Sequence, residues 1–73
     1  MTQSFTALLQ REEDGYVALC PELDVVSQGD TVEATENNLR EAVELFLETA
    51  SETEIGERLH SHVYVSRFEV TRG

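Results

Sequence analysis

The spacing of apolar residues changes at Asp30, and this change constrains the fold more than any other feature of the chain. Before Asp30, short apolar runs alternate with polar and turn-forming residues, a pattern that is typical of β-strands. After it, apolar residues recur three and four positions apart, which places them on one stripe of a helix. The stripe consists of Val32, Leu39, Ala42, Val43, Phe46, Leu47 and Ala50. The sequence therefore predicts a strand region followed by a long helix over about residues 31–49.

Turn-forming residues separate three apolar runs in the strand region. The runs lie at residues 5–9, 16–20 and 25–28. Asp14 and Gly15 form a common turn dipeptide, because glycine accepts positive φ and aspartate can bond its own backbone. Pro21 ends the second run, since proline has no N–H to give to a sheet, and Gly29 ends the third. We therefore expect a three-stranded antiparallel meander.

Capping signals mark the start of two helices. Asp30 or Thr31 can cap the long helix, and Glu33 follows Asp30 at the spacing of a capping box. Thr35 lies on the core stripe, so we expect its hydroxyl to bond a carbonyl one turn earlier. A second capping-box pattern at residues 51–54 predicts a short second helix.

Residues 62–71 are rich in β-branched and aromatic side chains, which favours a fourth strand. A helix that returns the chain makes this strand parallel to the first, through a right-handed crossover with sheet order 3-2-1-4. The expected fold class is α+β, β-β-β-α-β, with one long helix packed on one face of the sheet. Every strand carries apolar residues on both faces, so we expect a second copy to cover the other face in a homo-oligomer.

Composition excludes several classes of function for this 73-residue chain. It carries 15 acidic residues against 5 basic ones, all arginine, for a net charge of −10. Direct nucleic-acid binding is not expected, because phosphate contacts need a basic patch. The sequence has no apolar run long enough to span a membrane and no signal peptide, so we expect a cytoplasmic protein. Its single cysteine, Cys20, excludes an internal disulfide.

Three blocks of the sequence resemble a known family. They are DGYVALCPEL at residues 14–23, SQGDT at 27–31, and NLREA with ELFLE at 38–42 and 44–48. In this order and spacing they closely resemble the N-terminal domain of the HicB family of antitoxins. The resemblance implies a partly degraded ribonuclease-H-like fold and a partner, HicA, a small basic ribonuclease toxin that cleaves messenger RNA. Complete HicB proteins continue into a DNA-binding segment. This chain ends at Gly73, so we expect a single HicB-like domain over residues 1–73 without that segment.

A ribonuclease-H-like ancestry directs attention to carboxylates that could hold two metal ions about 4 Å apart. Asp14, Glu22, Asp24 and Asp30 are the candidates near strand ends. The turn explains Asp14 and the helix cap explains Asp30. We therefore expect a degraded active site, with no catalytic residue, no cofactor and no enzymatic activity.

His60, His62 and Cys20 are the remaining residues whose side chains could bind a metal or attack a substrate. Two histidines that are two positions apart project from one face of a strand, but no third ligand is evident, which favours surface histidines and no metal site. Cys20 has no neighbouring base, which favours a buried structural thiol over a nucleophile.

The long helix has an acidic outer face with one unusual placement. Glu44 and Glu48 repel each other, and Glu48 lies at the negative end of the helix dipole. Leu45 lies about 120° from the centre of the apolar stripe, so it is either a lone exposed leucine or an interface contact. Two interpretations stay open, a solvated face and a surface for a basic partner. The candidate partner-binding residues are Glu41, Glu44, Leu45 and Glu48.

The leading hypothesis is an antitoxin-like protein that binds and masks a small basic HicA-type toxin of a type II toxin-antitoxin system. The mechanism would be steric and electrostatic, because an acidic surface raises the rate of encounter with a basic partner. The alternative is an orphan homo-oligomeric scaffold or small-ligand-binding protein of the same fold. A neighbouring gene for a small basic chain would separate the two.

Overall fold

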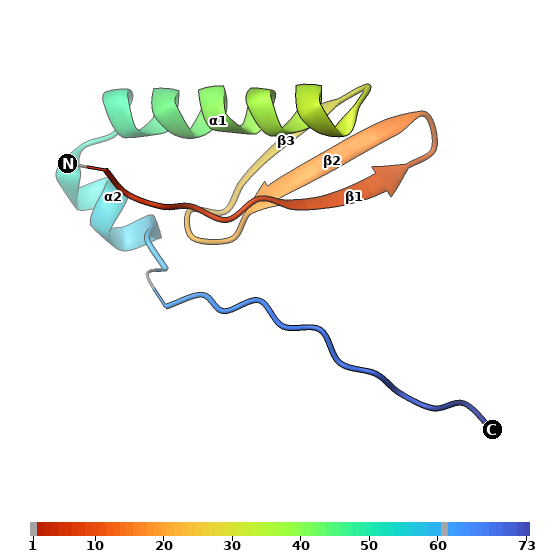
Figure 1. Ribbon diagram of the computed structural model, residues 1–73. Helices are drawn as coiled ribbons and strands as arrows, with labels where there is room; N and C mark the ends of the chain where they lie inside the picture. The colour runs from red at the N-terminus through yellow and green to blue at the C-terminus, as the bar shows by residue number, and fades with distance from the viewer. Residues whose placement is uncertain (1, 61) are drawn as a thin grey trace.

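The computed structural model describes residues 2–60 and 62–73, and it has a three-stranded antiparallel sheet with a long helix on one face (Figure 1). The elements are β1 (Leu8–Glu12), β2 (Gly15–Cys20), β3 (Val25–Gly29), α1 (Val32–Thr49) and α2 (Glu52–Arg58). The strands lie in the order β1-β2-β3. The predicted α+β class, the antiparallel meander and both helices are therefore confirmed.

The first hairpin is tighter, and lies further along the chain, than the apolar run at residues 5–9 indicated. Glu12 pairs with Gly15, so the turn consists of residues 13–14 alone. Gly15 does not adopt the positive φ that we expected of it. Instead, a Cβ at Gly15 would lie 2.6 Å from the carbonyl oxygen of Gly29. Glycine is needed here because two strands approach closely, which corrects the turn-based explanation.

Thr31 caps helix α1. Its side-chain oxygen accepts a hydrogen bond from the N–H of Ala34 at 3.0 Å. Asp30 lies one residue before the cap, so the capping box expected between Asp30 and Glu33 is wrong. The hydroxyl of Thr35 donates to the carbonyl of Thr31 at 2.6 Å, which confirms the predicted bond across one turn. This bond lets a polar side chain lie fully buried at the start of the helix.

Helix α2 begins with the predicted capping box. The side-chain oxygen of Ser51 accepts from the N–H of Glu54 at 3.1 Å, and the Glu54 carboxylate accepts from the N–H of Ser51 at 3.4 Å. These reciprocal bonds satisfy two donors that the first turn of a helix leaves free. Seven residues are too few for a helix that is stable alone, so α2 depends on contacts with the rest of the fold.

The core lies between α1 and the sheet. Its buried apolar residues are Ala18, Cys20, Leu23, Leu39 and Val43. Helix α1 packs mainly on β3 and β2 and barely reaches β1. The opposite face of the sheet has no covering element in the part of the chain that the structure describes. There Leu8, Leu19 and Val26 form a row across the three strands, with Leu8 40% and Val26 60% exposed.

Residues 62–73, which we call the arm, do not form the expected fourth strand. Within the described residues the arm is an extended segment that pairs with no strand and leaves the body of the molecule (Figure 1). Its large apolar side chains are exposed, by 87% at Tyr64, 61% at Val65, 84% at Phe68 and 74% at Val70. The sheet order 3-2-1-4 is therefore not observed, because alternation of side chains makes a segment extended but a strand also needs a paired neighbour.

Candidate partner-binding site

The four residues predicted to bind a partner lie together on the outer surface of α1. Glu41, Glu44, Leu45 and Glu48 are all exposed, Leu45 by 59%. At 3.6 residues per turn they span an arc of about 100° on the side of the helix that faces away from the sheet. The buried stripe is the opposite side, formed by Thr35, Leu39 and Val43. The helix thus presents one exposed leucine among three carboxylates.

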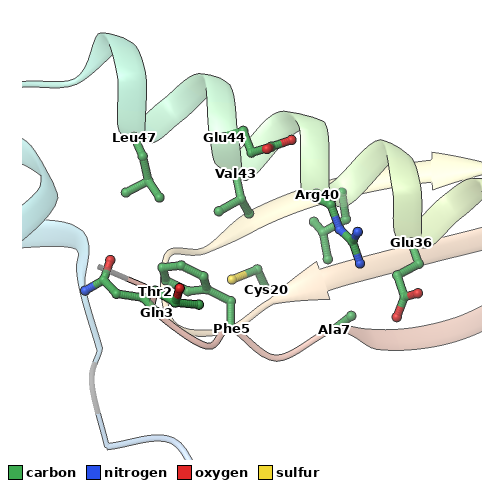
Figure 2. A pocket seen from close by; sticks show the side chains of 11 residues that line it. Thr2, Gln3, Phe5, Ala7, Cys20, Glu36, Arg40, Val43, Glu44 and Leu47 are labelled. Carbon is green, nitrogen blue, oxygen red and sulfur yellow. The ribbon is translucent and has the colours of Figure 1, made fainter.

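A groove of about 620 Å³ opens beside this surface, between α1 and the segment 2–7 that precedes β1 (Figure 2). It is lined by Thr2, Gln3, Phe5, Ala7, Cys20, Glu36, Leu39, Arg40, Val43, Glu44 and Leu47. Aliphatic and aromatic side chains form its floor, and charged side chains of α1 form its rim. The groove exists because α1 covers β3 and β2 but leaves the strip next to β1 open. We call it the α1–β1 groove.

Glu22 is a buried carboxylate with a full set of partners. It is 8% exposed, and it accepts from the Thr6 N–H at 2.9 Å and from the Thr6 hydroxyl at 2.6 Å. Burial by itself raises the pKa of Glu22, but the hydrogen bonds from Thr6 outweigh it and hold the pKa below its ordinary value. Glu22 therefore stabilises the fold as an anion and is not available to a substrate.

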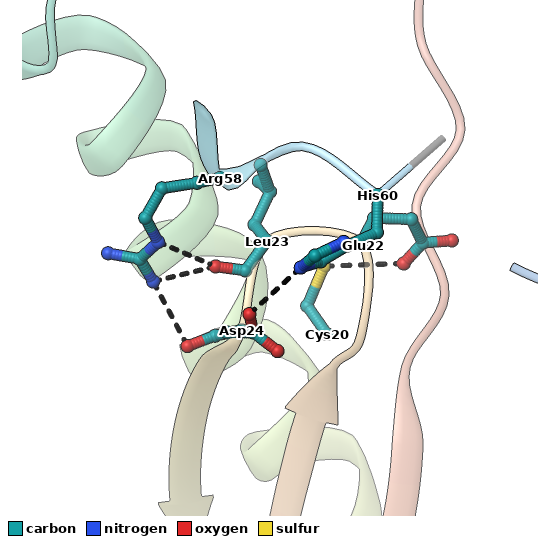
Figure 3. Close-up of polar contacts among 6 residues, drawn as sticks. All are labelled: Cys20, Glu22, Leu23, Asp24, Arg58 and His60. Atoms are coloured by element: carbon teal, nitrogen blue, oxygen red, sulfur yellow. Dashed lines mark hydrogen bonds and ion pairs between the residues drawn. The ribbon is translucent and has the colours of Figure 1, made fainter. Parts of the chain in front are cut away.

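Cys20 is buried, as predicted. Its thiol donates to the Glu22 carboxylate at 3.5 Å (Figure 3). Burial raises the pKa of the Cys20 thiol, and the neighbouring carboxylate raises it further. A thiol with a raised pKa keeps its proton at neutral pH and is a poor nucleophile.

The other carboxylates proposed from the ribonuclease-H resemblance do not converge. Asp14 and Asp30 lie where β2 begins and β3 ends, whereas Glu22 and Asp24 lie in the turn at the opposite end of these strands. The side chain of Asp24 is 3.2 Å from Nε2 of His60 (Figure 3). Among the residues that the structure describes, no three His, Cys, Asp or Glu side chains form a cluster that could hold a metal ion.

Arg58 makes contacts that sequence reasoning did not identify. It donates to the carbonyls of Leu23 and Asp24 (Figure 3). Its guanidinium also lies 4.9 Å from the centroid of the Phe46 ring. Asp24 has a φ of 55°, which orients the turn so that both carbonyls point at Arg58. An arginine in the last turn of a short helix was the only available signal, and it does not indicate a partner 35 residues away.

The fold and these surfaces define a small acidic α+β protein with an exposed, charged helix. The chain is 48% identical over 48 residues to UPF0150 protein ssr1765 from Synechocystis sp., and 44% identical over 48 residues to UPF0150 protein ssr1258 from the same organism. The matches cover 63% of this chain, and 61% and 70% of the two relatives. The chain belongs to the UPF0150 family.

The chain thus spans 61% of the length of ssr1765. No protein-family model matches the chain, and no solved structure matches it. In the described part of the chain, no helix combines the length and the apolar character needed to cross a membrane.

Proposed function

We propose that this protein is an antitoxin-like inhibitor that binds and masks a small basic HicA-type ribonuclease of a type II toxin-antitoxin system. The observation that carries the proposal is the outer surface of α1, where Leu45 lies exposed among Glu41, Glu44 and Glu48. A charged rim around an apolar side chain is a common arrangement at protein interfaces. A basic ribonuclease would meet this surface with its RNA-binding face, and the bound antitoxin would then exclude RNA.

Inhibition of this kind needs no chemistry from the antitoxin. Glu22 and Asp24 are engaged in structural contacts, so we propose that the protein has no enzymatic activity, no cofactor and no direct contact with nucleic acid. The net charge of −10 favours fast association with a basic partner and repels phosphate backbones. On this hypothesis the fold is a partly degraded ribonuclease-H-like domain of the HicB type, acting in the cytoplasm.

The test is association kinetics with a purified HicA-type toxin at low and moderate salt. The triple variant Glu41→Gln, Glu44→Gln, Glu48→Gln should associate several-fold more slowly at low salt, with a flatter salt dependence, because rim charges act mainly on the on-rate. A matched control removes three exposed carboxylates elsewhere, at Glu12, Glu13 and Glu57. Equal on-rates in the two triple variants would show that the carboxylates of the α1 surface do not speed association. If the unmodified protein does not bind the toxin, the proposed function is wrong.

A second candidate function rests on the α1–β1 groove. Its volume of about 620 Å³ lies within the range of small-ligand sites, and its apolar floor with a few polar groups is typical of them. An orphan scaffold or small-ligand-binding protein would therefore use this groove rather than the outer surface of α1. A gene for a small basic chain next to this one favours the antitoxin, and its absence favours the orphan.

A further inference from the structure

We propose that two copies of this chain exchange arms, so that the arm of each copy becomes the fourth strand of the other. In that arrangement the arm, residues 62–73, pairs along the free edge of β1 in the second copy and fills its α1–β1 groove. The exchange needs no toxin, because it joins two surfaces of this chain that fit each other.

The isolated chain exposes far more surface than a compact protein of its mass. Its accessible surface is 6193 Å² for 8.2 kDa, whereas a compact monomer of this size exposes about 4,500 Å². The radius of gyration is 14.4 Å, against about 11 Å for a compact chain of this length. The excess of roughly 1,700 Å² per chain is about twice the 800 Å² that each partner buries in a standard protein interface. The arm accounts for the elongated shape (Figure 1).

The free edge of β1 matches the arm in length. β1 is an outer strand of the sheet, and residues 2–7 run on from it in the same line (Figure 1). Residues 2–12 thus offer one edge to the twelve residues of the arm, which span about 40 Å when extended. Unpaired edges of this kind bind extended segments of other chains through main-chain hydrogen bonds.

Both faces of the arm would find apolar cover beside β1. Tyr64, Phe68 and Val70 lie on one face of the extended arm, and Val63 and Val65 lie on the other. A strand added next to β1 presents one face to the α1–β1 groove. Its other face lies on the uncovered side of the sheet, next to Leu8, and would lengthen the apolar row of Leu8, Leu19 and Val26 by one strand. An arm with apolar side chains on both faces is what this position requires.

Charge favours the same pairing. The arm holds two of the five arginines, Arg67 and Arg72, and one of the fifteen acidic residues, so its net charge is +1 and the rest of the chain carries −11. Two of the three charged side chains that line the groove are Glu36 and Glu44. The weakly basic arm would therefore bind beside acidic side chains. Without the arms between them, the acidic remainders of the two chains would repel each other.

His60, two residues before the arm, is anchored to the turn between β2 and β3. The N–H of His60 donates to the carbonyl of Glu22 at 2.6 Å, and its ring lies 3.2 Å from the Asp24 carboxylate. In Figure 1 the arm runs away from α1 and from residues 2–7, the two segments between which its own groove lies. A two-fold exchange then fills two grooves and pairs two edges at once, and it closes without leaving a free arm.

The first experiment measures the mass of the full chain in solution by light scattering at tens of micromolar. We expect a dimer. The variant Tyr64→Ser, Phe68→Ser should shift to monomer with unchanged circular dichroism, because both side chains lie outside the core. The control variant Val32→Ser, Leu45→Ser removes two apolar side chains that are also exposed, by 50% and 59%, but lie on α1. It should stay a dimer. A monomeric unmodified chain, or a dimer unaffected by the arm variant, would overturn the exchange.

The second experiment separates exchange from docking of the arm on its own chain. In an equal mixture of ¹³C-labelled and unlabelled protein, isotope-filtered NMR detects only contacts between copies. The rings of Tyr64 and Phe68 should contact methyl groups of Leu39, Val43 or Leu47 across the two copies. If these contacts are absent from the mixed sample but present in a fully ¹³C-labelled sample, the arm is docked on its own groove. Contacts between copies confined to Leu8 and Val26 would show a dimer through the uncovered sheet face, and either result would refute the proposal.

Discussion

The guanidinium of Arg58 donates two hydrogen bonds to one main-chain oxygen, that of Leu23, at 3.1 Å from Nε and 2.6 Å from Nη2. Leu23 is fully buried in the turn between β2 and β3. No residue of α2 is fully buried, although Leu59, which follows it, packs against the core. Arg58 therefore attaches the end of α2 to the turn between β2 and β3, together with the packing of Leu59.

Replacing Arg58 with alanine should detach α2. We expect the free energy of unfolding to fall by about 1–2 kcal/mol, because two carbonyls lose a charged donor and Phe46 loses its cation. Urea denaturation at fixed protein concentration measures the loss, and hydrogen exchange should show early opening of residues 52–58. Arg58→Lys should recover only part of the stability, since one ammonium cannot reproduce the fork of Nε and Nη2. Full recovery by lysine would show that charge alone matters.

The buried carboxylate of Glu22 should make stability depend on pH. Its pKa in the folded protein lies below its value in the unfolded chain, so the unfolded chain binds the proton more readily. The stabilisation is complete above the ordinary pKa of a glutamate side chain, which is its value in the unfolded chain, and is lost as pH falls through the lower folded pKa. Thermal melts between pH 7 and pH 3 should show this loss, and Glu22→Gln should flatten that part of the curve.

Glu22→Gln should also lower stability at pH 7 by about 1–3 kcal/mol, because the bonds from Thr6 then go to a neutral group. Glu57→Gln is the matched control, since Glu57 is exposed on α2, and exposed substitutions change stability by less than about 0.5 kcal/mol. Equal pH profiles for the two variants would show that Glu22 contributes nothing as an anion.

The regular elements could be predicted from the sequence because periodicity and capping are local properties. The bond from Thr35 to Thr31 and the box at Ser51 depend on residues three or four apart, and both are confirmed. The ends of the first hairpin could not be placed, since an apolar run shows where side chains are buried but not where pairing begins. The need for glycine at position 15 could not be predicted either, because it comes from the close approach of Gly29, which lies fourteen positions away on β3.

The exposure of the four candidate partner-binding residues was predictable for the same reason. Helix geometry alone places Glu41, Glu44, Leu45 and Glu48 on one exposed surface, and the structure agrees. The α1–β1 groove depends on where α1 crosses the sheet, which apolar spacing does not specify. The pairing of the arm could not be predicted either, because alternating side chains indicate an extended segment but do not show which sheet edge it joins.

Gly29 and Gly56 lie in opposite surroundings, because a side chain at Gly29 would be confined and one at Gly56 would be free. A Cβ at Gly29 would lie 2.8 Å from the hydroxyl of Thr35 and 2.9 Å from its main-chain nitrogen, while a Cβ at Gly56 would meet nothing within 4 Å. The Thr35 hydroxyl is held by its bond to Thr31, so it cannot move aside without breaking a buried hydrogen bond. Gly29→Ala should therefore lower the free energy of unfolding by about 1–3 kcal/mol.

Gly56→Ala should do the opposite. Gly56 lies inside α2, where alanine stabilises a helix by about 0.5–1 kcal/mol relative to glycine because it restricts the unfolded chain. Urea denaturation of both variants at one protein concentration measures the pair. Stabilisation by both alanines would mean that β3 and the start of α1 separate easily, and destabilisation by both would mean that α2 is not helical in solution. Opposite signs follow only if Gly29 is pressed against the first turn of α1 while α2 stays open to solvent.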